Sequence, residues 1–267
     1  MKEKDLKFYI QSSINIEAHD TIFVACEELG YDFESVPIIP FSTELPDDID
    51  FSKPGMPYGS TTFIRLSGEH PNLKKYTYQS KEKLNPQTYY EKLGDLYLNE
   101  PVYVGPIKDV PDFEEVFMKC NSDGKDITGR VYTLDEIQEL RRITTTQYED
   151  GNIVSPDLEV FCSTTKDLAF ETRNIFIGGE WIDGSYYRKN GRTCRNRMTD
   201  EDAEIIEFAK KCIDRYQPFD MNVVDIGLSY HGLKCIEYNC FNASGWYACD
   251  HKLIIQKAKE WCLSEGN

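Results

Sequence analysis

The sequence predicts an α/β protein. Strand-like apolar runs alternate with segments of helical periodicity along most of the 267 residues, and glycine-containing turns separate two pairs of strand-like runs. The length corresponds to one large domain or two small ones. A chain of this size buries roughly 70–75% of its extended surface, so we expect a hydrophobic core that needs no disulfides or metals.

The composition excludes several classes of protein. The chain has 30 Lys and Arg against 46 Asp and Glu, a net charge of −16, whereas nucleic acids and anionic membranes require a basic surface. The longest apolar run, residues 22–26, is far short of the roughly 20 residues that span a membrane, and the N-terminus lacks the apolar core of a signal peptide. With nine scattered cysteines, we expect free thiols and a cytoplasmic protein with no membrane partner.

The first part of the chain is expected to form a small α/β unit. A strand-like run at 6–11 precedes a helix at 17–29, whose apolar residues share one face and which Gly30 ends. The apolar run at 36–41 is broken by two prolines. Residues 61–66 contain three apolar and three β-branched side chains, which predicts a strand.

The middle of the chain is polar and rich in tyrosine before its elements become regular. Thr133 and Glu136 have the spacing of a capping box, so a helix is expected to start there. The elements expected in this part are some helix around 88–96, strands at 102–104 and 116–119, a polar loop at 121–129, a short run at 130–133 and a helix at 134–143.

The last part of the chain has the clearest patterns. Residues 170–176 and 181–187 flank two glycines and predict a hairpin. Residues 199–216 predict a helix, because apolar residues recur at helical spacing and Thr199 can cap its start. The other elements expected here are strands at 152–155 and 159–162, a second hairpin of 222–227 and 234–239, and a closing helix at 253–262.

The second hairpin carries the sharpest functional signal. Asp225 and Glu237 lie symmetrically about position 231, which would oppose them across the hairpin with Cβ atoms about 4.5–5.5 Å apart. Asn239 would share the face of Glu237. Opposed carboxylates in apolar surroundings repel each other unless a cation lies between them, and oxygen ligands alone favour Mg²⁺ or Mn²⁺. A solvated pair of acids on an exposed sheet is the alternative that the spacing leaves open.

Two further features could contact phosphates. Lys119 ends an apolar strand, and Lys125 lies in the glycine-bearing loop that follows. A loop with a lysine and backbone N–H groups is one way to cover phosphates. Glu171 and Arg173 alternate on a strand. Taken alone, a solvated hairpin and a structural ion pair explain these residues better than a phosphate site does.

The order of these elements resembles the ATP-grasp superfamily, in particular its small phage and bacterial branch named for two arginines and a lysine. The resemblance covers about residues 112–265 and is carried by Glu171-Thr172-Arg173, by Gly-Ser-Tyr-Tyr-Arg at 184–188 and by Glu-Tyr-Asn-Cys-Phe-Asn-Ala-Ser-Gly at 237–245. It implies an α/β protein with an ATP-grasp fold of α+β subdomains. The implied domains are an N-terminal pre-ATP-grasp α/β domain with a connector at 1–111 and an ATP-grasp domain at 112–267, divided into a lysine and lid subdomain at 112–158 and a metal-binding subdomain at 159–267.

The resemblance also implies a role for each candidate residue. Lys119 and Lys125 would contact the nucleotide phosphates, and Glu171 would belong to the same nucleotide site. Arg173 and Arg188 would stabilise the transferred phosphoryl group or an acyl phosphate. The metal ion would be held by Asp225, Glu237 and Asn239, and the hinge around adenine would be formed by Val154, Ser155, Pro156, Asp157 and Leu158.

The activity that the resemblance implies is ATP-dependent ligation of a carboxylate to an amine through an acyl phosphate. ATP and Mg²⁺ or Mn²⁺ would be required, and the acid and the amine are not identified by the sequence. The alternatives are a non-ligase ATP-binding assembly chaperone, since residues 63–67 resemble a segment of a related eukaryotic chaperone family, and a phosphotransferase. All three functions need the same nucleotide site, so the sequence alone does not separate them.

A cationic run stands out against the overall negative charge. Residues 188–197 contain five cations and no acid. A local field of one sign concentrates ligands of the opposite sign, so this run is a candidate site for an anionic co-substrate or an acidic peptide. A solvated loop is the alternative. The cations are Arg188, Lys189, Arg192, Arg195 and Arg197.

Overall fold

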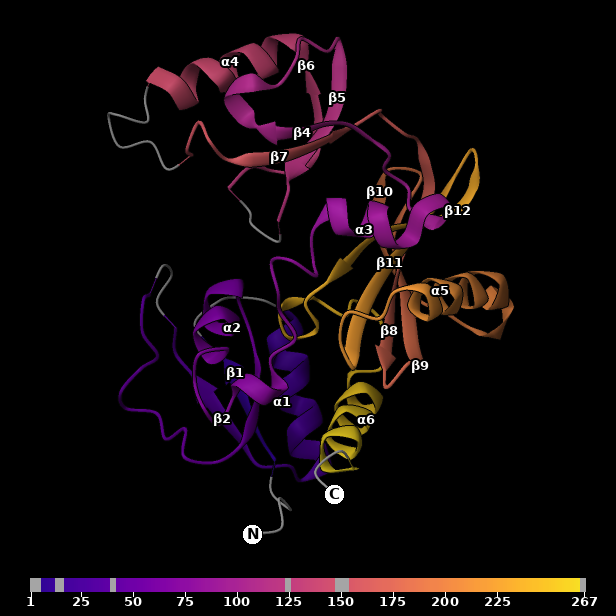
Figure 1. The fold of residues 1–267 in the computed structure, drawn as a ribbon. Coiled ribbons are helices and arrows are strands. Elements are labelled where there is room, and N and C mark those ends of the chain that lie inside the picture. The colour runs from indigo at the N-terminus through magenta and orange to yellow at the C-terminus, as the bar shows by residue number, and fades with distance from the viewer. Residues whose placement is uncertain (1–5, 13–16, 39–41, 123–125, 147–153, 265–267) are drawn as a thin grey trace. The chain divides into compact units, whose positions relative to one another are not determined.

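The computed structural model describes residues 6–12, 17–38, 42–122, 126–146 and 154–264 (Figure 1). The chain divides into two compact units. The first unit consists of Met1–Gln79, Phe170–Ile226 and Tyr238–Asn267, and the second of Ser80–Ala169 and Gly227–Glu237. The domain boundaries expected after residues 111 and 158 stay predictions.

The N-terminal part of the first unit is a three-stranded parallel sheet in the order β2-β1-β3. β1 (Lys7–Gln11) and helix α1 (Glu17–Leu29) match the predicted strand and helix. Gly30 has a φ of 64°, the left-handed conformation that favours glycine after a helix. β2 (Phe33–Val36) ends before Pro37, and β3 (Gly55–Tyr58) is the other edge strand.

The strand predicted at 61–66 is wrong, because these residues form helix α2 (Thr61–Ser67). The Ser60 side chain accepts a hydrogen bond from the backbone N–H of Phe63, which starts the helix. The apolar side chains that favoured a strand are buried at helical spacing instead, at Phe63, Ile64 and Leu66. A short apolar run does not by itself separate a strand from a buried helix.

A five-stranded sheet in the order β10-β9-β8-β11-β12 carries most of the candidate residues. The first hairpin pairs its strands in antiparallel fashion around Gly178 and Gly179, whose φ values of 60° and 83° match a tight two-residue turn. Both predicted hairpins are present. The strands are β8 (Leu168–Ile177), β9 (Glu180–Lys189), β10 (Arg192–Arg197), β11 (Met221–Ser229) and β12 (Gly232–Asn239).

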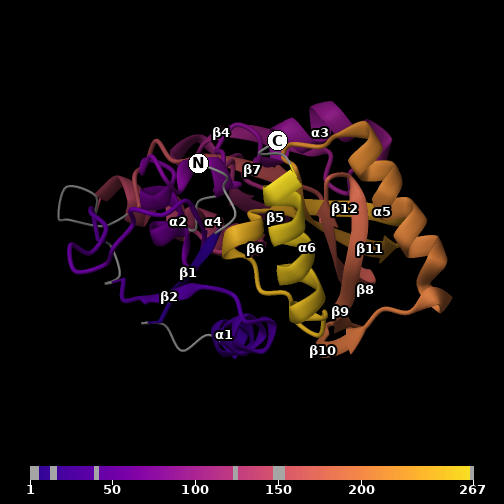
Figure 2. The same cartoon turned by 90° about the horizontal axis from the view of Figure 1, so that it is seen from below.

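Helices α5 (Ala203–Arg215) and α6 (His251–Ser264) lie on either side of this sheet (Figure 2). Thr199, expected to cap this helix, forms a capping box with Asp202 at the 3₁₀ turn Asp200–Asp202 that precedes α5. Apolar residues of α1, α6 and alternate positions of β8 and β11 share one core, whose buried members include Ile22, Ile175, Ile177, Val223, Trp246 and Ile255.

The second unit is built on a four-stranded antiparallel sheet in the order β4-β7-β5-β6. Thr133 and Glu136 exchange hydrogen bonds of 2.9 and 3.5 Å at the start of α4, which confirms the predicted capping box. A core of Val116, Met118, Ile137 and Val160 packs between sheet and helix. The elements are α3 (Pro86–Leu93), β4 (Pro101–Pro106), β5 (Glu115–Cys120), β6 (Arg130–Thr133), α4 (Leu134–Thr146) and β7 (Glu159–Ser163).

All nine cysteines are free, and all but Cys194 are buried. Within the described ranges, no helix combines the length and the apolar character needed to cross a bilayer.

Candidate functional site

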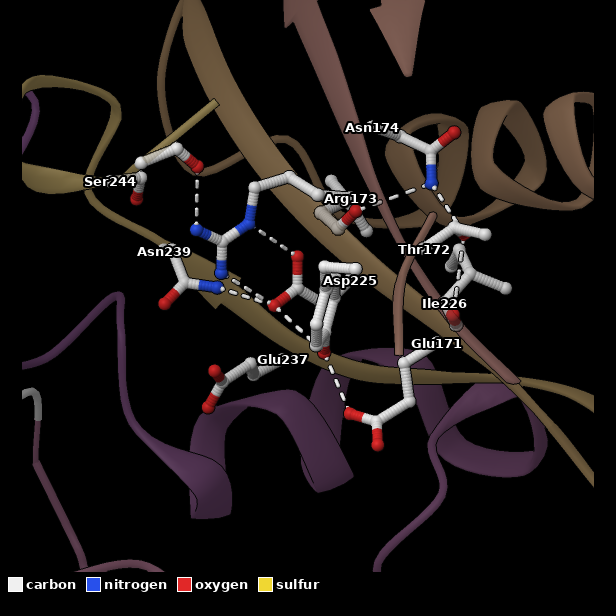
Figure 3. A network of polar contacts seen from close by, with 12 residues as sticks. Glu171, Thr172, Arg173, Asn174, Asp225, Ile226, Glu237, Asn239 and Ser244 are labelled. Atoms are coloured by element: carbon white, nitrogen blue, oxygen red, sulfur yellow. Dashed lines mark hydrogen bonds and ion pairs between the residues drawn. The ribbon is translucent and has the colours of Figure 1, made fainter. Parts of the chain in front are cut away.

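The centre of the site in the first unit is a buried ion pair between Arg173 and Asp225 (Figure 3). β8 supplies the arginine and β11 the aspartate, and these strands are neighbours in the sheet. Nε and Nη2 of Arg173 lie 2.9 and 2.8 Å from the two carboxylate oxygens of Asp225. The side chains are only 9% and 1% exposed. Charges are buried to this extent only when they are paired and hydrogen-bonded.

The guanidinium group of Arg173 is held from other directions as well. Its Nη1 donates to the carbonyl oxygen of Gly245 at 2.9 Å. Its central carbon lies 4.9 Å from the ring centroid of Tyr247 and 5.6 Å from that of Tyr187, and these two rings stack on each other. Burial disfavours the charge, but the Asp225 carboxylate outweighs burial and raises the pKa of Arg173. Arg173 is therefore a fixed cation at any ordinary pH.

Four more residues join this pair in what we call the Asp225 network: Glu171, Tyr187, Arg188 and Asn239. The Asn239 amide donates to Asp225 Oδ2 at 3.1 Å. The Tyr187 hydroxyl donates to Glu171 at 2.8 Å and lies 3.4 Å from Asp225 Oδ2. Arg188 Nη1 donates to the other Glu171 oxygen at 3.0 Å. The structure thus brings together five predicted site residues: Glu171, Arg173, Arg188, Asp225 and Asn239.

The two arginines that sequence reasoning assigned to the same role have different surroundings. Arg188 is 50% exposed and forms an ion pair with the Glu171 carboxylate. Arg173 is almost fully buried and donates three hydrogen bonds. Only Arg188 can readily present its charge to a bound ligand.

Sequence reasoning missed the two tyrosines around Arg173. Tyr187 belongs to the Gly-Ser-Tyr-Tyr-Arg segment at 184–188, but only the register of β9 against β8 shows that its hydroxyl donates to Glu171. Tyr247 has a φ of 49°, unusual for a residue other than glycine. Its loop is anchored on both sides of it, because Ala248 N–H donates to Ser185 Oγ at 3.2 Å and Gly245 accepts from Arg173. No sequence pattern indicates this conformation.

In the second unit, Lys119 and Glu237 form an ion pair. The Nζ of Lys119, near the end of β5, lies 2.6 Å from Glu237 Oε2, near the end of β12. The side chains are 20% and 28% exposed, so the pair is partly accessible to solvent. Glu237 therefore lies beside a cation, and the lysine predicted to contact phosphates lies beside a residue predicted to hold a metal. Lys125 lies outside the described residues.

The predicted adenine hinge, residues 154–158, belongs to the second unit. Val154 and Leu158 are partly buried against its core. The carbonyl oxygens of Pro156 and Leu158 accept hydrogen bonds from Lys108 and Ile107 at 3.2 and 2.9 Å. The strand expected at 152–155 is not formed at Val154 and Ser155, because the Ser155 carbonyl accepts from Leu158 in a turn instead. Residues 152 and 153 lie outside the described chain.

The candidate metal ligands fit a hard divalent cation by their chemistry. Asp225, Glu237 and Asn239 offer oxygen donors, which Mg²⁺ and Mn²⁺ prefer. In the described part of the chain, no three His, Cys, Asp or Glu side chains gather into a group that could hold a metal. Both oxygens of Asp225 already contact Arg173. A cation bound by Asp225 would therefore meet the guanidinium.

Comparison with known families identifies the class of protein. The family model described as ATP-grasp domain, R2K clade family 3, matches residues 65–257, which is most of the chain. The chain therefore belongs to this ATP-grasp family. The match confirms the predicted resemblance and the predicted fold. No curated protein matches the chain in sequence.

Solved structures share the fold at low sequence identity. D-alanine–D-alanine ligase from Bacillus anthracis has a TM-score of 0.57 and 13% identity over 98% of this chain and 100% of that one. The RimK domain protein ATP-grasp from Sphaerobacter thermophilus DSM 20745 has a TM-score of 0.56 and 10% identity over 97% of each chain. L-amino acid ligase from Bacillus licheniformis has a TM-score of 0.54 and 12% identity over 88% of this chain and 68% of that one.

Proposed function

We propose that the protein is an ATP-dependent ligase that joins a carboxylate to an amine, with Mg²⁺ or Mn²⁺ as the metal ion. The observation that carries the proposal is the buried Asp225 network within an ATP-grasp fold. Two of the similar structures are amino acid ligases by name, which supports a ligase reaction. Nine free thiols agree with the reducing cytoplasm of a bacterial or phage-infected cell.

The proposed reaction has two steps. The substrate carboxylate attacks the γ-phosphorus of ATP, the bond to the β-phosphate oxygen breaks, and an acyl phosphate and ADP form. An amine then attacks the acyl carbon, phosphate leaves with the electron pair of the broken C–O bond, and loss of a proton from nitrogen gives the amide. In phosphoryl transfer the protein contributes mainly positioning and charge neutralisation.

The residues of this chain would divide that work. Asp225, Glu237 and Asn239 would hold the metal ion, which when bound neutralises charge on the phosphate oxygens. Lys119 and Lys125 would bind the α- and β-phosphates. Arg188 is exposed enough to offset negative charge on the transferred phosphoryl group. Glu171 would orient the Arg188 side chain through their ion pair. Residues 154–158 would hold adenine, and the lysine loop at 121–129 would close over the acyl phosphate and exclude water.

Product analysis by mass spectrometry tests the proposal. The protein is incubated with ATP, Mg²⁺ and mixtures of amino acids and short peptides, and ADP and new amides are measured. ADP formed together with an amide supports the ligase. ADP with a phosphorylated product and no amide indicates the phosphotransferase, and ATP binding without turnover on any of these substrates indicates the assembly chaperone. A chain that binds no nucleotide at millimolar concentration would overturn all three functions.

A further inference from the structure

We propose that Arg173 is a built-in counter-cation of Asp225, so that Asp225 accepts a metal ion only together with the nucleotide. The inference rests on the proposed function, because it assumes that Asp225 is a metal ligand. It assigns Arg173 a positioning role in place of the contact with the phosphoryl group that the family resemblance implied.

The first argument is that Arg173 is fixed. Its guanidinium donates to both oxygens of Asp225 and to the Gly245 carbonyl, and the stacked rings of Tyr187 and Tyr247 lie beside it. Turning toward a ligand would break these contacts and leave the buried Asp225 carboxylate without its cation, which is strongly unfavourable. Arg173 therefore stabilises the ionised Asp225 carboxylate that it already contacts.

The second argument is the local charge. Arg173 and Asp225 together are neutral, so a free divalent cation gains little from approaching them and is repelled by a guanidinium bonded to the same carboxylate. The triphosphate of ATP carries several negative charges, which reverse this balance. The metal site is therefore complete only when phosphate oxygens are present, and nucleotide and metal bind with positive coupling.

The third argument is the contrast with Arg188. Arg188 is half exposed and bonds to Glu171 at the edge of the Asp225 network, so it can reach a ligand without leaving a buried charge unpaired. The two arginines thus have separate roles: Arg188 would contact the bound ligand, whereas Arg173 neutralises Asp225.

The test uses Mn²⁺ alone as the probe, with the free ion measured by electron paramagnetic resonance on the full chain. For the parent protein, a non-hydrolysable ATP analogue should tighten Mn²⁺ binding by about tenfold or more. Arg173→Gln should tighten the binding of Mn²⁺ without nucleotide by about tenfold, because the competing cation is gone. The same variant should unfold at a lower temperature in metal-free buffer, and Mn²⁺ should restore part of the loss.

Two further variants serve as controls. Arg173→Lys keeps the positive charge, so Mn²⁺ without nucleotide should bind as weakly as to the parent. The double variant Arg173→Gln/Asp225→Asn removes both charges, so it should be more stable than Arg173→Gln and should not gain Mn²⁺ affinity. Its residual binding also measures the background from the many acidic side chains elsewhere.

The outcomes separate this inference from the proposed function. If the parent binds Mn²⁺ as tightly without the analogue as with it, or if Arg173→Gln gains no affinity, Arg173 is not a counter-cation. If Arg173→Gln does not fold, the parent measurement alone decides. If the analogue fails to bind the parent but Arg173→Gln gains Mn²⁺ affinity, the proposed function fails while the electrostatic role of Arg173 stands.

Discussion

Tyr247 combines a left-handed backbone with a ring beside a buried guanidinium. An L-residue other than glycine loses about 1 kcal/mol in this conformation. Replacing the tyrosine by alanine or by glycine removes the ring in both cases, but only glycine also removes the backbone strain. We therefore expect Tyr247→Gly to be more stable than Tyr247→Ala by about 1 kcal/mol in urea unfolding.

Val131 provides the matched control, because it is an exposed strand residue and its φ is not among the positive ones. At that position alanine should be more stable than glycine. If alanine is also the more stable residue at position 247, the left-handed conformation of Tyr247 is wrong.

Glu237 is expected to be essential for turnover but not for folding. Glu237→Gln keeps the shape of the side chain and removes a negative charge from the proposed metal site. The pair with Lys119 is partly exposed, so its loss should change the unfolding free energy by only about 1 kcal/mol. Steady-state kinetics and urea unfolding measure the two effects.

The matched control is Glu139→Gln in the exposed pair with Arg142, which should leave turnover unchanged. Turnover that survives in Glu237→Gln would assign Glu237 a structural role.

Lys119→Ala should weaken ATP binding, and an unchanged dissociation constant would show that Lys119 does not contact phosphates.

The residue types of the site could be predicted from the sequence, but their partners could not. The sequence placed Arg173 near Glu171, since residues two apart share a strand face. Facing residues on adjacent strands lie closer, at about 4.5–5.5 Å, than residues two apart on one strand. The neighbouring strand therefore supplies the partner, which is Asp225, 52 positions away.

At the scale of elements, the register of the first hairpin decides which residues meet. Its turn pairs Ile177 with Glu180, and uninterrupted counting from there would place Tyr186 opposite Glu171. Register shifts between Glu171 and Thr172 and between Ile175 and Phe176 bring Arg188 opposite Glu171 instead. The sequence predicted both strands and their turn, but a bulge has no clear residue signature, so this ion pair could not be predicted.

Helix α2 depends on its cap more than on its residue propensities. Its first two residues are β-branched threonines, which favour strands. We expect Ser60→Ala to lower the unfolding free energy by about 1 kcal/mol, because the N–H of Phe63 loses its acceptor. Ser60→Asp retains an acceptor and should remain close to the parent in a thermal melt. Equal loss in both variants would indicate that the cap does not hold the helix.

The cations of the run at 188–197 have different surroundings in the structure. Arg188 pairs with Glu171, and Arg197 pairs with Asp183 and Asp250. Arg192 and Arg195 are exposed on β10, an edge strand. Because of this exposure they stay candidates for binding an anionic co-substrate, whereas Arg197 already has two carboxylates beside it.

We expect Arg192→Gln/Arg195→Gln to raise the KM for the non-nucleotide substrate and to flatten its salt dependence, since the local field is reduced. ATP affinity should be unchanged. Lys210→Gln/Lys211→Gln on α5 removes the same charge elsewhere and should leave both quantities at parental values. If both double variants behave like the parent, the run is a solvated edge that prevents strand pairing between molecules.

At the scale of the whole molecule, the sequence predicted the class and most of the helices and strands, because these depend on local periodicity, whereas it missed β3 and β10 and took α2 for a strand. The two units, in contrast, are each assembled from separate stretches of chain, such as Met1–Gln79 with Phe170–Ile226. Contacts between such distant stretches leave no periodic signal. Only the family resemblance could extend the prediction from elements to a fold.

Binding of Mg-ATP should stabilise the whole molecule, because a ligand that binds only the folded chain shifts its unfolding equilibrium. At a concentration of 100 times the dissociation constant, the expected gain is about 2.7 kcal/mol. Lys119 and Glu237 pair with each other in the second unit and are the candidate phosphate-binding and metal-binding residues tested here. If both contribute, Lys119→Ala and Glu237→Gln should each reduce the rise in melting temperature, whereas Glu139→Gln should not.

ATP without a divalent metal should give a smaller rise in melting temperature than Mg-ATP, since the carboxylates then face the phosphates without a cation between them. Equal rises with and without metal would exclude a metal role for these acids, and no rise with any nucleotide would exclude the nucleotide site itself.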